Sequence, residues 1–154
     1  MPLVRILVDA YSLLHAWPEL APGRPRHSAA AREALIAKLT QYRDASGTPV
    51  TIVFDGSRPR GVNAAENSAP EVEILYTQAG QTADQVIERA AGLFRPYGEV
   101  LAVTNDIAER ETVASMGGSV MSCANFVRLV EGTLDDLGRQ LNHYNAKEIG
   151  RAHV

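Results

Sequence analysis

Short runs of apolar residues alternate with longer stretches of helical periodicity along this chain of 154 residues. This alternation is typical of α/β domains with a parallel sheet. Strands are expected at Leu3–Val8, Val50–Phe54, Val72–Leu75, Val100–Val103 and, more weakly, Ser119–Met121. The first, second and fourth runs are almost wholly apolar, as in strands that helices cover on both faces. The chain is therefore expected to fold around a mostly parallel central sheet.

Capping residues predict where the first two long helices begin. Ser28 is a typical N-cap residue, and the helix after it is expected to end near Gly47. Thr82 with Gln85 three residues later forms a capping box, which opens a second helix. The segment Trp17–Arg26 contains three prolines and is expected to be a loop.

A third helix is expected from about Asp106 to Met116, because two glycines follow it. The chain after Ser122 reads as helical to about Tyr144, with a break predicted near Gly132-Thr133. The polar segment Ser57–Pro70 is expected to be a longer loop. Because strands on both sides of that loop belong to one sheet, residues 1–145 are expected to form one domain and 146–154 a C-terminal tail.

Composition excludes several classes of protein. The single cysteine, Cys123, excludes an internal disulfide framework and a cysteine-based zinc site. No apolar run approaches the length needed to span a membrane, and the first run is too short for a signal peptide. A cytoplasmic protein is expected. The net charge of -3 excludes a uniformly basic surface, so any attraction to nucleic acid must be local.

Acidic residues recur where strands end. Asp9 follows the first strand, Asp55 the second, and Asp106 lies just past the fourth. The carboxyl ends of parallel strands meet at one edge of a sheet, where ligands of such sheets bind. Asp84, in the first turn of the Thr82-capped helix, can face the same edge.

Taken singly, each of these acids is more typical of a helix or turn cap than of a catalytic group. As a set they favour a metal site. Oxygen ligands of this kind suit Mg²⁺ or Mn²⁺, and no histidine or cysteine stands beside them at zinc-like spacing. The chemistry expected at such a site is metal-assisted hydrolysis of a phosphodiester.

Four local sequences resemble the motifs of one family, the YacP-like NYN domains. In chain order they are Ile6-Leu7-Val8-Asp9-Ala10-Tyr11-Ser12-Leu13, Val53-Phe54-Asp55-Gly56, Gly80-Gln81-Thr82-Ala83-Asp84 with Val86-Ile87-Glu88-Arg89, and Val103-Thr104-Asn105-Asp106 with Glu109-Arg110. The third is the most specific match. The resemblance covers the chain from about Leu3 to Val130, in the family's order.

The resemblance implies a three-layer PIN-like fold with strand order 3-2-1-4-5 and a divalent-metal-dependent endoribonuclease. It implies RNA as the substrate, with messenger RNA at the ribosome as an expected form of it. Carried over to this chain, it gives Asp9, Asp84 and Asp106 as metal ligands, with Asp55 as a weaker candidate. Ser12 occupies the place of a polar asparagine in the family's first motif and is counted with the catalytic residues.

Two residues depart from that first motif. Ala10 stands where the family has glycine, which would matter if the backbone there needed positive φ. Ser12 replaces asparagine, so a short hydroxyl stands in for a longer amide. These departures leave a second interpretation open. In it, the chain keeps the fold and binds RNA or the ribosome, with weak cleavage or none.

Basic residues near the expected edge are candidates for RNA contact. Arg24 and Arg26 lie in one predicted loop, Arg58 and Arg60 in another, and Arg110 follows the fourth-strand motif. Arginine side chains on such loops are suited to phosphate oxygens.

Two other classes of α/β domain fit less well. A response-regulator receiver needs an acid beside Asp9 and a lysine after the last strand. Ala10 occupies the first place, and no lysine lies between Lys38 and Lys147. A haloacid-dehalogenase-like phosphatase needs a second aspartate two residues after Asp9, where Tyr11 stands.

Overall fold

The computed structural model describes residues 3–56 and 72–152, with side chains described as far as residue 148. Its five strands are β1 (Leu3–Asp9), β2 (Val50–Phe54), β3 (Val72–Tyr76), β4 (Glu99–Val103) and β5 (Ser119–Met121). Neighbouring strands are parallel throughout, in the order β3-β2-β1-β4-β5. The predicted α/β class and strand order 3-2-1-4-5 are confirmed.

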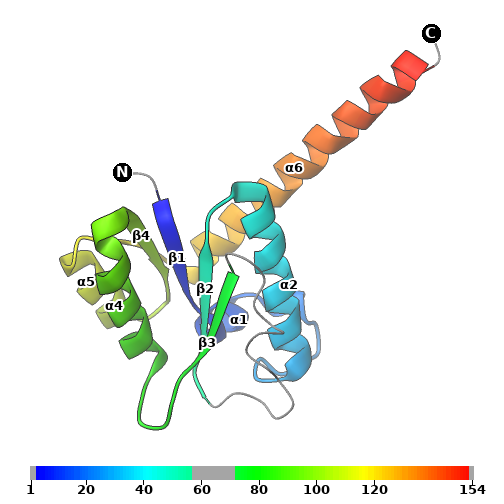
Figure 1. Cartoon of the computed structure of the whole chain (residues 1–154). Helices are drawn as coiled ribbons and strands as arrows, with labels where there is room; N and C mark the ends of the chain where they lie inside the picture. Colours follow the sequence, from blue (N-terminus) through cyan, green and yellow to red (C-terminus); the bar gives the residue numbers. More distant parts are fainter. Residues whose placement is uncertain (1–2, 57–71, 153–154) are drawn as a thin grey trace.

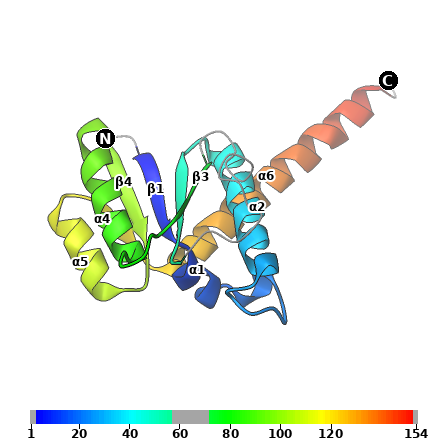
Figure 2. The same ribbon diagram turned by 60° about the horizontal axis from the view of Figure 1, so that its bottom comes forward.

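Helices cover both faces of the sheet (Figures 1 and 2). One face carries α1 (Ala10–Ala16), α2 (Ala29–Ser46) and the first turns of α6 (Cys123–Ala152). The other carries α4 (Ala83–Phe94) and α5 (Ile107–Ser115). Two short 3₁₀ turns, η1 (Pro18–Leu20) and η2 (Arg95–Tyr97), complete the described elements.

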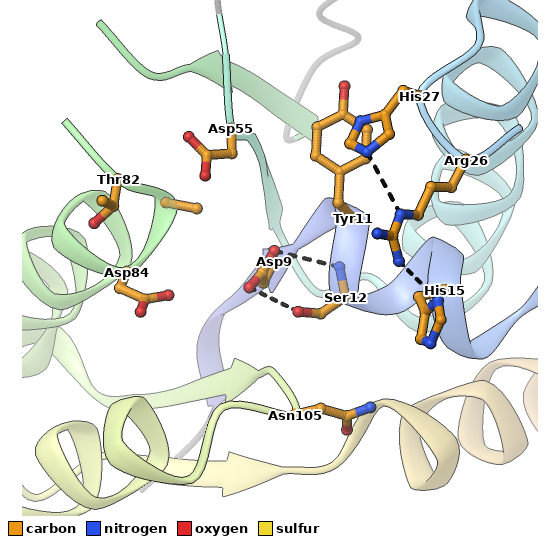
Figure 3. A pocket seen from close by; sticks show the side chains of 11 residues that line it. Asp9, Tyr11, Ser12, His15, Arg26, His27, Asp55, Thr82, Asp84 and Asn105 are labelled. Carbon is orange, nitrogen blue, oxygen red and sulfur yellow. Dashed lines mark hydrogen bonds between the residues drawn. The ribbon is translucent and has the colours of Figure 1, made fainter. Parts of the chain in front are cut away.

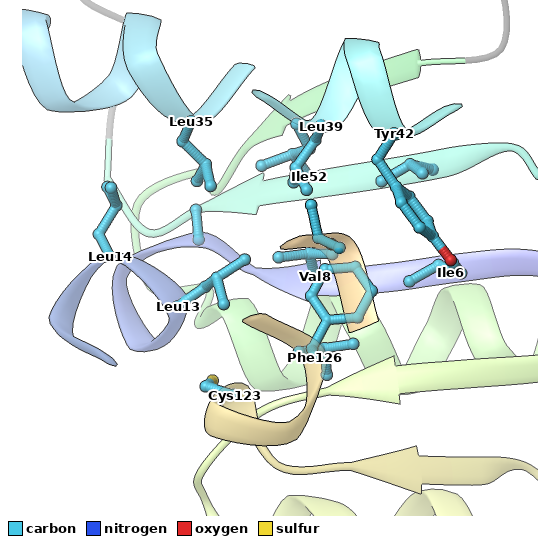
Figure 4. Close-up of a cluster of buried hydrophobic side chains, with 14 of the residues drawn as sticks. Ile6, Val8, Leu13, Leu14, Leu35, Leu39, Tyr42, Ile52, Cys123 and Phe126 are labelled. Atoms are coloured by element: carbon cyan, nitrogen blue, oxygen red, sulfur yellow. The ribbon is translucent and has the colours of Figure 1, made fainter. Parts of the chain in front are cut away.

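Alternation along β1 separates two buried clusters. Ile6 and Val8 point to the face covered by α1, α2 and α6, where they meet Leu39 and Phe126 (Figure 4). Leu7 points to the opposite face, among residues of α4 and α5. Successive side chains of a strand alternate between faces, so a central strand needs apolar residues at nearly every position. The continuous apolar run predicted this double burial.

The predicted capping signals operate as expected. Thr82 Oγ1 accepts a bond from the Gln85 amide at 3.2 Å, and the Gln85 side chain accepts one from the Thr82 amide at 3.0 Å. Ser28 Oγ accepts from the Ala31 amide at 3.2 Å and opens α2. Gly47 ends α2 with φ of 74°, a conformation that favours glycine. Asp84 is thereby fixed in the first turn of α4.

The proline-rich segment after α1 is tied to the last helix. It contains the single 3₁₀ turn η1 and is otherwise irregular, as predicted. Trp17 is only 3% exposed, and its indole N–H donates to Glu131 Oε1 of α6 at 3.1 Å. This contact holds the start of the segment against the body of the domain.

The predicted break in the last helix is wrong. Helix α6 is continuous from Cys123 to Ala152 and runs through Gly132-Thr133. On either side of the glycine, Val130 belongs to the buried cluster under α6 and the partly buried Leu134 packs against it. This packing outweighs the weak helix propensity of glycine. The helix also continues past residue 145, where a tail was predicted, and projects beyond the sheet (Figure 1).

The segment Ser57–Pro70, predicted as a loop, lies outside the described residues. Within the described residues, no helix combines the length and apolar character needed to cross a membrane.

Candidate metal centre

Asp9 ends β1 and caps helix α1 at the carboxyl edge of the sheet. Its Oδ2 accepts a hydrogen bond from the Ser12 hydroxyl at 2.9 Å and a longer one from Thr104 Oγ1 at 3.5 Å. The Ser12 amide donates to Oδ1 at 3.5 Å. Figure 3 shows the two bonds from Ser12. The side chain of Asp9 is thereby oriented by α1 on one side and by the residue that follows β4 on the other.

Asp9, Asp84 and Glu109 form a three-carboxylate group. One oxygen from each can be chosen so that all three lie within 4.8 Å of one another. The residues come from the end of β1, the first turn of α4 and the first turn of α5. Oxygens around one octahedral Mg²⁺ would stand roughly 3 to 4 Å apart, given bonds of about 2.1 Å. The three carboxylate oxygens would need to approach one another only slightly to bind one ion.

Glu109 is the most unusual member of the group. It is 2% exposed, and neither carboxylate oxygen has a hydrogen-bond partner among the described residues. Burial, followed by the nearby Asp84 and Asp9 carboxylates, raises the pKa of Glu109 to about 9, while the neighbouring Thr104 hydroxyl acts in the opposite direction. A buried carboxylate without donors is costly unless it is protonated or a cation lies beside it.

The pKa of Asp9 is raised as well. Burial is the main cause, and the Asp84 and Asp55 charges add to it, while the hydrogen bonds from Ser12 act in the opposite direction. Without a bound ion, the negative charges at a divalent-cation site repel one another, and the pKa values of its acids rise. Asp9 and Glu109 both show this effect. The donor set and its electrostatics therefore fit Mg²⁺ or Mn²⁺.

The structure places Asp106 outside this group. Its Oδ1 accepts hydrogen bonds from the amides of Ala108 at 2.9 Å and Glu109 at 3.3 Å, so it is the N-cap of α5. The side chain is exposed and is occupied by this capping role. Its predicted part as a metal ligand stays untested, but the geometry favours Glu109, a residue of the fourth motif for which no role was predicted.

A sequence signal for Glu109 did exist. Asp106 and Glu109 have the spacing of an N-cap and the third residue of a helix. Glu109 and Val113 are the two buried residues of α5, four residues apart on one helix face. A glutamate on the buried face of a short helix, next to a strand-end acid, indicates a functional carboxylate.

Asp55 stands at the rim of the same site. It follows β2, is exposed, and accepts a hydrogen bond from Thr77 Oγ1 at 3.1 Å. Its charge contributes to the raised pKa of Asp9, which places it within electrostatic reach of the group. Metal binding by Asp55 stays a prediction.

A cavity of about 480 Å³ opens over the acids (Figure 3). We call it the carboxylate cavity. Asp9, Asp55 and Asp84 lie on one side of it, and basic and aromatic groups lie on the other. This second side is formed by the basic residues Arg26, His15 and His27 and by the aromatic Tyr11. The site therefore combines a place for a cation with a wall suited to an anion.

The predicted RNA-contacting arginines are spread over different places. Arg26 lines the carboxylate cavity, and Arg24 lines a neighbouring one. Arg110 is half-buried in α5, where its charge acts on the Cys123 thiol. Arg58 and Arg60 lie outside the described residues. RNA contact by these residues stays a prediction.

Ala10 is the first residue of α1 and lies in a helix. A helical backbone has negative φ, so alanine is suited to this place and no glycine is required. Ser12 reaches Asp9 directly through its hydroxyl. Both departures from the family's first motif are therefore compatible with an ordered three-carboxylate group.

A parallel sheet in this order, with acids gathered at its carboxyl edge, is the arrangement of PIN-like nuclease domains. The chain belongs to the family of YacP-like NYN domains, whose model matches residues 6–153. It is 29% identical over 127 residues to the uncharacterized protein YacP of Bacillus subtilis strain 168, a match covering 82% of this chain and 74% of that protein.

Two solved structures of Bacillus subtilis Rae1 (YacP) share the fold. The first, of a mutant form, superposes with a TM-score of 0.74 at 26% sequence identity, covering 94% of this chain and 85% of that one. The second gives a TM-score of 0.72 at 25% identity, covering 97% and 85%. The fold and family expected from the sequence motifs are thus confirmed.

Proposed function

We propose that this protein is a divalent-metal-dependent endoribonuclease whose ion is held by Asp9, Asp84 and Glu109. The observation that carries the proposal is the buried Glu109 carboxylate, which has no hydrogen-bond partner within residues 3–56 and 72–148 and lies beside two further acids. Membership of a nuclease family supports the reaction class. The family resemblance supports RNA as the substrate, with messenger RNA on the ribosome as one form of it. The single cysteine supports a cytoplasmic location.

The protein groups have separable roles in this proposal. When Mg²⁺ or Mn²⁺ is bound, it supplies an activated water and offsets charge developing on the phosphate. Ser12 and Thr104 hold Asp9 through its Oδ2. The Asp106 cap fixes the first turn of α5 and thereby the position of Glu109. Arg26, across the carboxylate cavity, is placed to bind a phosphate of the substrate.

The direct test is cleavage of a circular RNA, which has no ends and can be opened only by an endonuclease. We expect linear products with Mn²⁺ or Mg²⁺, none in EDTA, and none from Asp84→Asn. Asp135→Asn, which alters an exposed carboxylate on α6, is the matched control and should cleave like the unmodified protein. The assay should be repeated with ribosome-bound message.

The result that would overturn the proposal is RNA binding by the unmodified protein without metal-dependent cleavage of either substrate. The non-cutting RNA- or ribosome-binding domain would then be the better description.

A further inference from the structure

A second cavity lies beside the carboxylate cavity and shares part of its wall. Its volume is about 470 Å³, within the range of small-ligand sites. We call it the Trp17 cavity. Its apolar wall is formed by Leu14, Trp17, Pro18, Ala21 and Ala31. Arg24 and Arg26 also line it, so an apolar hollow is combined with two cations.

His15 and Arg26 line both cavities and form the wall between them. Arg26 Nη1 lies 2.8 Å from His15 Nδ1, and Arg26 Nε donates to His27 Nε2 at 3.4 Å. A guanidinium can only donate, so both of these histidine nitrogens act as acceptors. The other nitrogen of each ring then carries the hydrogen. The shared wall thus offers donors on its free side and is suited to an anion.

We propose that the Trp17 cavity binds the base of a nucleotide next to the scissile phosphate of the RNA. This inference rests on the proposed function and adds a base-binding subsite to it. A phosphate at the His15–Arg26 wall would lie between the carboxylates on one side and the Trp17 cavity on the other. A base joined to that phosphate then enters the apolar hollow.

The charge and shape of the Trp17 cavity favour a nucleotide. Arg24 and Arg26 match the phosphates that flank a base, and the apolar wall matches its faces. A base must leave the helical stack to enter such a hollow, and unstacking is much more costly in a duplex than in a single strand. The base bound in the Trp17 cavity is therefore expected to be unpaired.

The fluorescence of Trp17 can be used to follow binding in this cavity. Trp17 is the single tryptophan of the chain and lines this cavity, so a ligand bound there is expected to change its fluorescence. The experiment titrates a short oligoadenylate into the full chain in EDTA, where the RNA stays intact, and follows Trp17 fluorescence. We expect a saturable change with the single strand. A blunt duplex of equal length should bind at least tenfold more weakly.

Two variants locate the binding. Ala21→Phe fills the cavity from a half-buried position, and Arg24→Ala removes an exposed cation; both should weaken the fluorescence-detected affinity, the first by at least tenfold. Their matched controls are Ala114→Phe and Arg89→Ala, on exposed positions of α5 and α4, which should bind as the unmodified protein does. Circular dichroism confirms that each variant is folded.

The outcomes separate this inference from the proposed function. Asp84→Asn should lose cleavage and keep the fluorescence change. A fluorescence change without metal-dependent cleavage would support the cavity and overturn the nuclease. Cleavage with no fluorescence change, or with an unaltered affinity in both Ala21→Phe and Arg24→Ala, would overturn the cavity alone.

Discussion

Glu109 is the residue that most strongly indicates a metal site, because its carboxylate is buried and faces two other acids. Most buried carboxylates in folded proteins are paired or hydrogen-bonded. Glu109 has neither oxygen satisfied among the described residues and faces two other acids. Its burial weakens the fold unless a proton or a cation is present. That cost is what makes the residue informative about function.

The first prediction concerns pH. The pKa of Glu109 rises from 4.5 to about 9 on folding, so the folded state holds this proton more tightly than the unfolded state. The resulting stability is complete below about pH 4.5 and is lost as pH rises toward 9. In EDTA, the Tm of the unmodified protein should therefore fall relative to that of Glu109→Gln between pH 5 and pH 9. Adding Mn²⁺ at pH 8 should raise the Tm of the unmodified protein and leave that of Glu109→Gln nearly unchanged.

If the Tm values of the two proteins changed in parallel with pH in EDTA, the raised pKa of Glu109 would be contradicted. Differential scanning calorimetry provides the measurement.

The second prediction concerns Ser12. Removing its hydroxyl in Ser12→Ala takes away the 2.9 Å bond that orients Asp9. Since a misplacement of about 1 Å can cost on the order of a hundredfold in rate, cleavage should fall about 10- to 100-fold. Ser12→Thr keeps the hydroxyl and should keep most of the rate. Initial rates at saturating Mn²⁺ test this, and equal rates for Ser12→Ala and Ser12→Thr would remove Ser12 from the site.

At the scale of elements, helix α5 carries two acids, Asp106 at its N-cap and Glu109 in its first turn, and the sequence did not predict which of them faces the metal site. The strand-end position of Asp106 suggested a ligand, yet a strand-end acid is equally suited to cap the helix that follows. The structure shows the cap. Which of the two carboxylates turns inward depends on how α5 packs against α4 and β5. This is tertiary packing between separate elements, which local sequence patterns do not contain.

The third prediction follows from that cap. Asp106→Ala should lower the free energy of unfolding by about 1 kcal/mol, the usual value for losing an N-cap side chain. Asp106→Asn should lose much less, because an amide oxygen can still accept from the Ala108 and Glu109 amides. Urea denaturation in EDTA measures both. An equal loss in the two variants would show that charge, and not capping, is what Asp106 contributes to stability.

At the scale of the whole molecule, the sheet and the helices α2, α4 and α5 were predictable, while α1 and the extent of α6 were not. Apolar runs and capping residues are local signals, and they located the strands and the starts of α2 and α4. The run through Gly132 depends on packing around Val130 and Leu134, which no local signal reports. Beyond that point the helix leaves the core. Leu141 is 53% exposed and Tyr144 is 60% exposed.

The fourth prediction uses this difference along α6. Truncation after Asn145 should change the free energy of unfolding by less than about 0.5 kcal/mol, because the described side chains beyond it are exposed. Phe126→Ala, at a fully buried position of the same helix, should cost about 3 to 5 kcal/mol. Urea denaturation compares them, and a loss above 1 kcal/mol on truncation would show that the end of α6 stabilises the domain.

The central claim is that Asp9, Asp84 and Glu109 together bind one divalent ion. Calorimetric titration of Mn²⁺ tests it most directly, in the unmodified protein and in the variants Asp84→Asn, Glu109→Gln and Asp106→Asn. We predict one ion per chain, an affinity at least tenfold weaker in Asp84→Asn and Glu109→Gln, and an affinity close to that of the unmodified protein in Asp106→Asn. Unchanged affinity in Glu109→Gln, with loss in Asp106→Asn, would contradict the account and restore Asp106 as the third ligand.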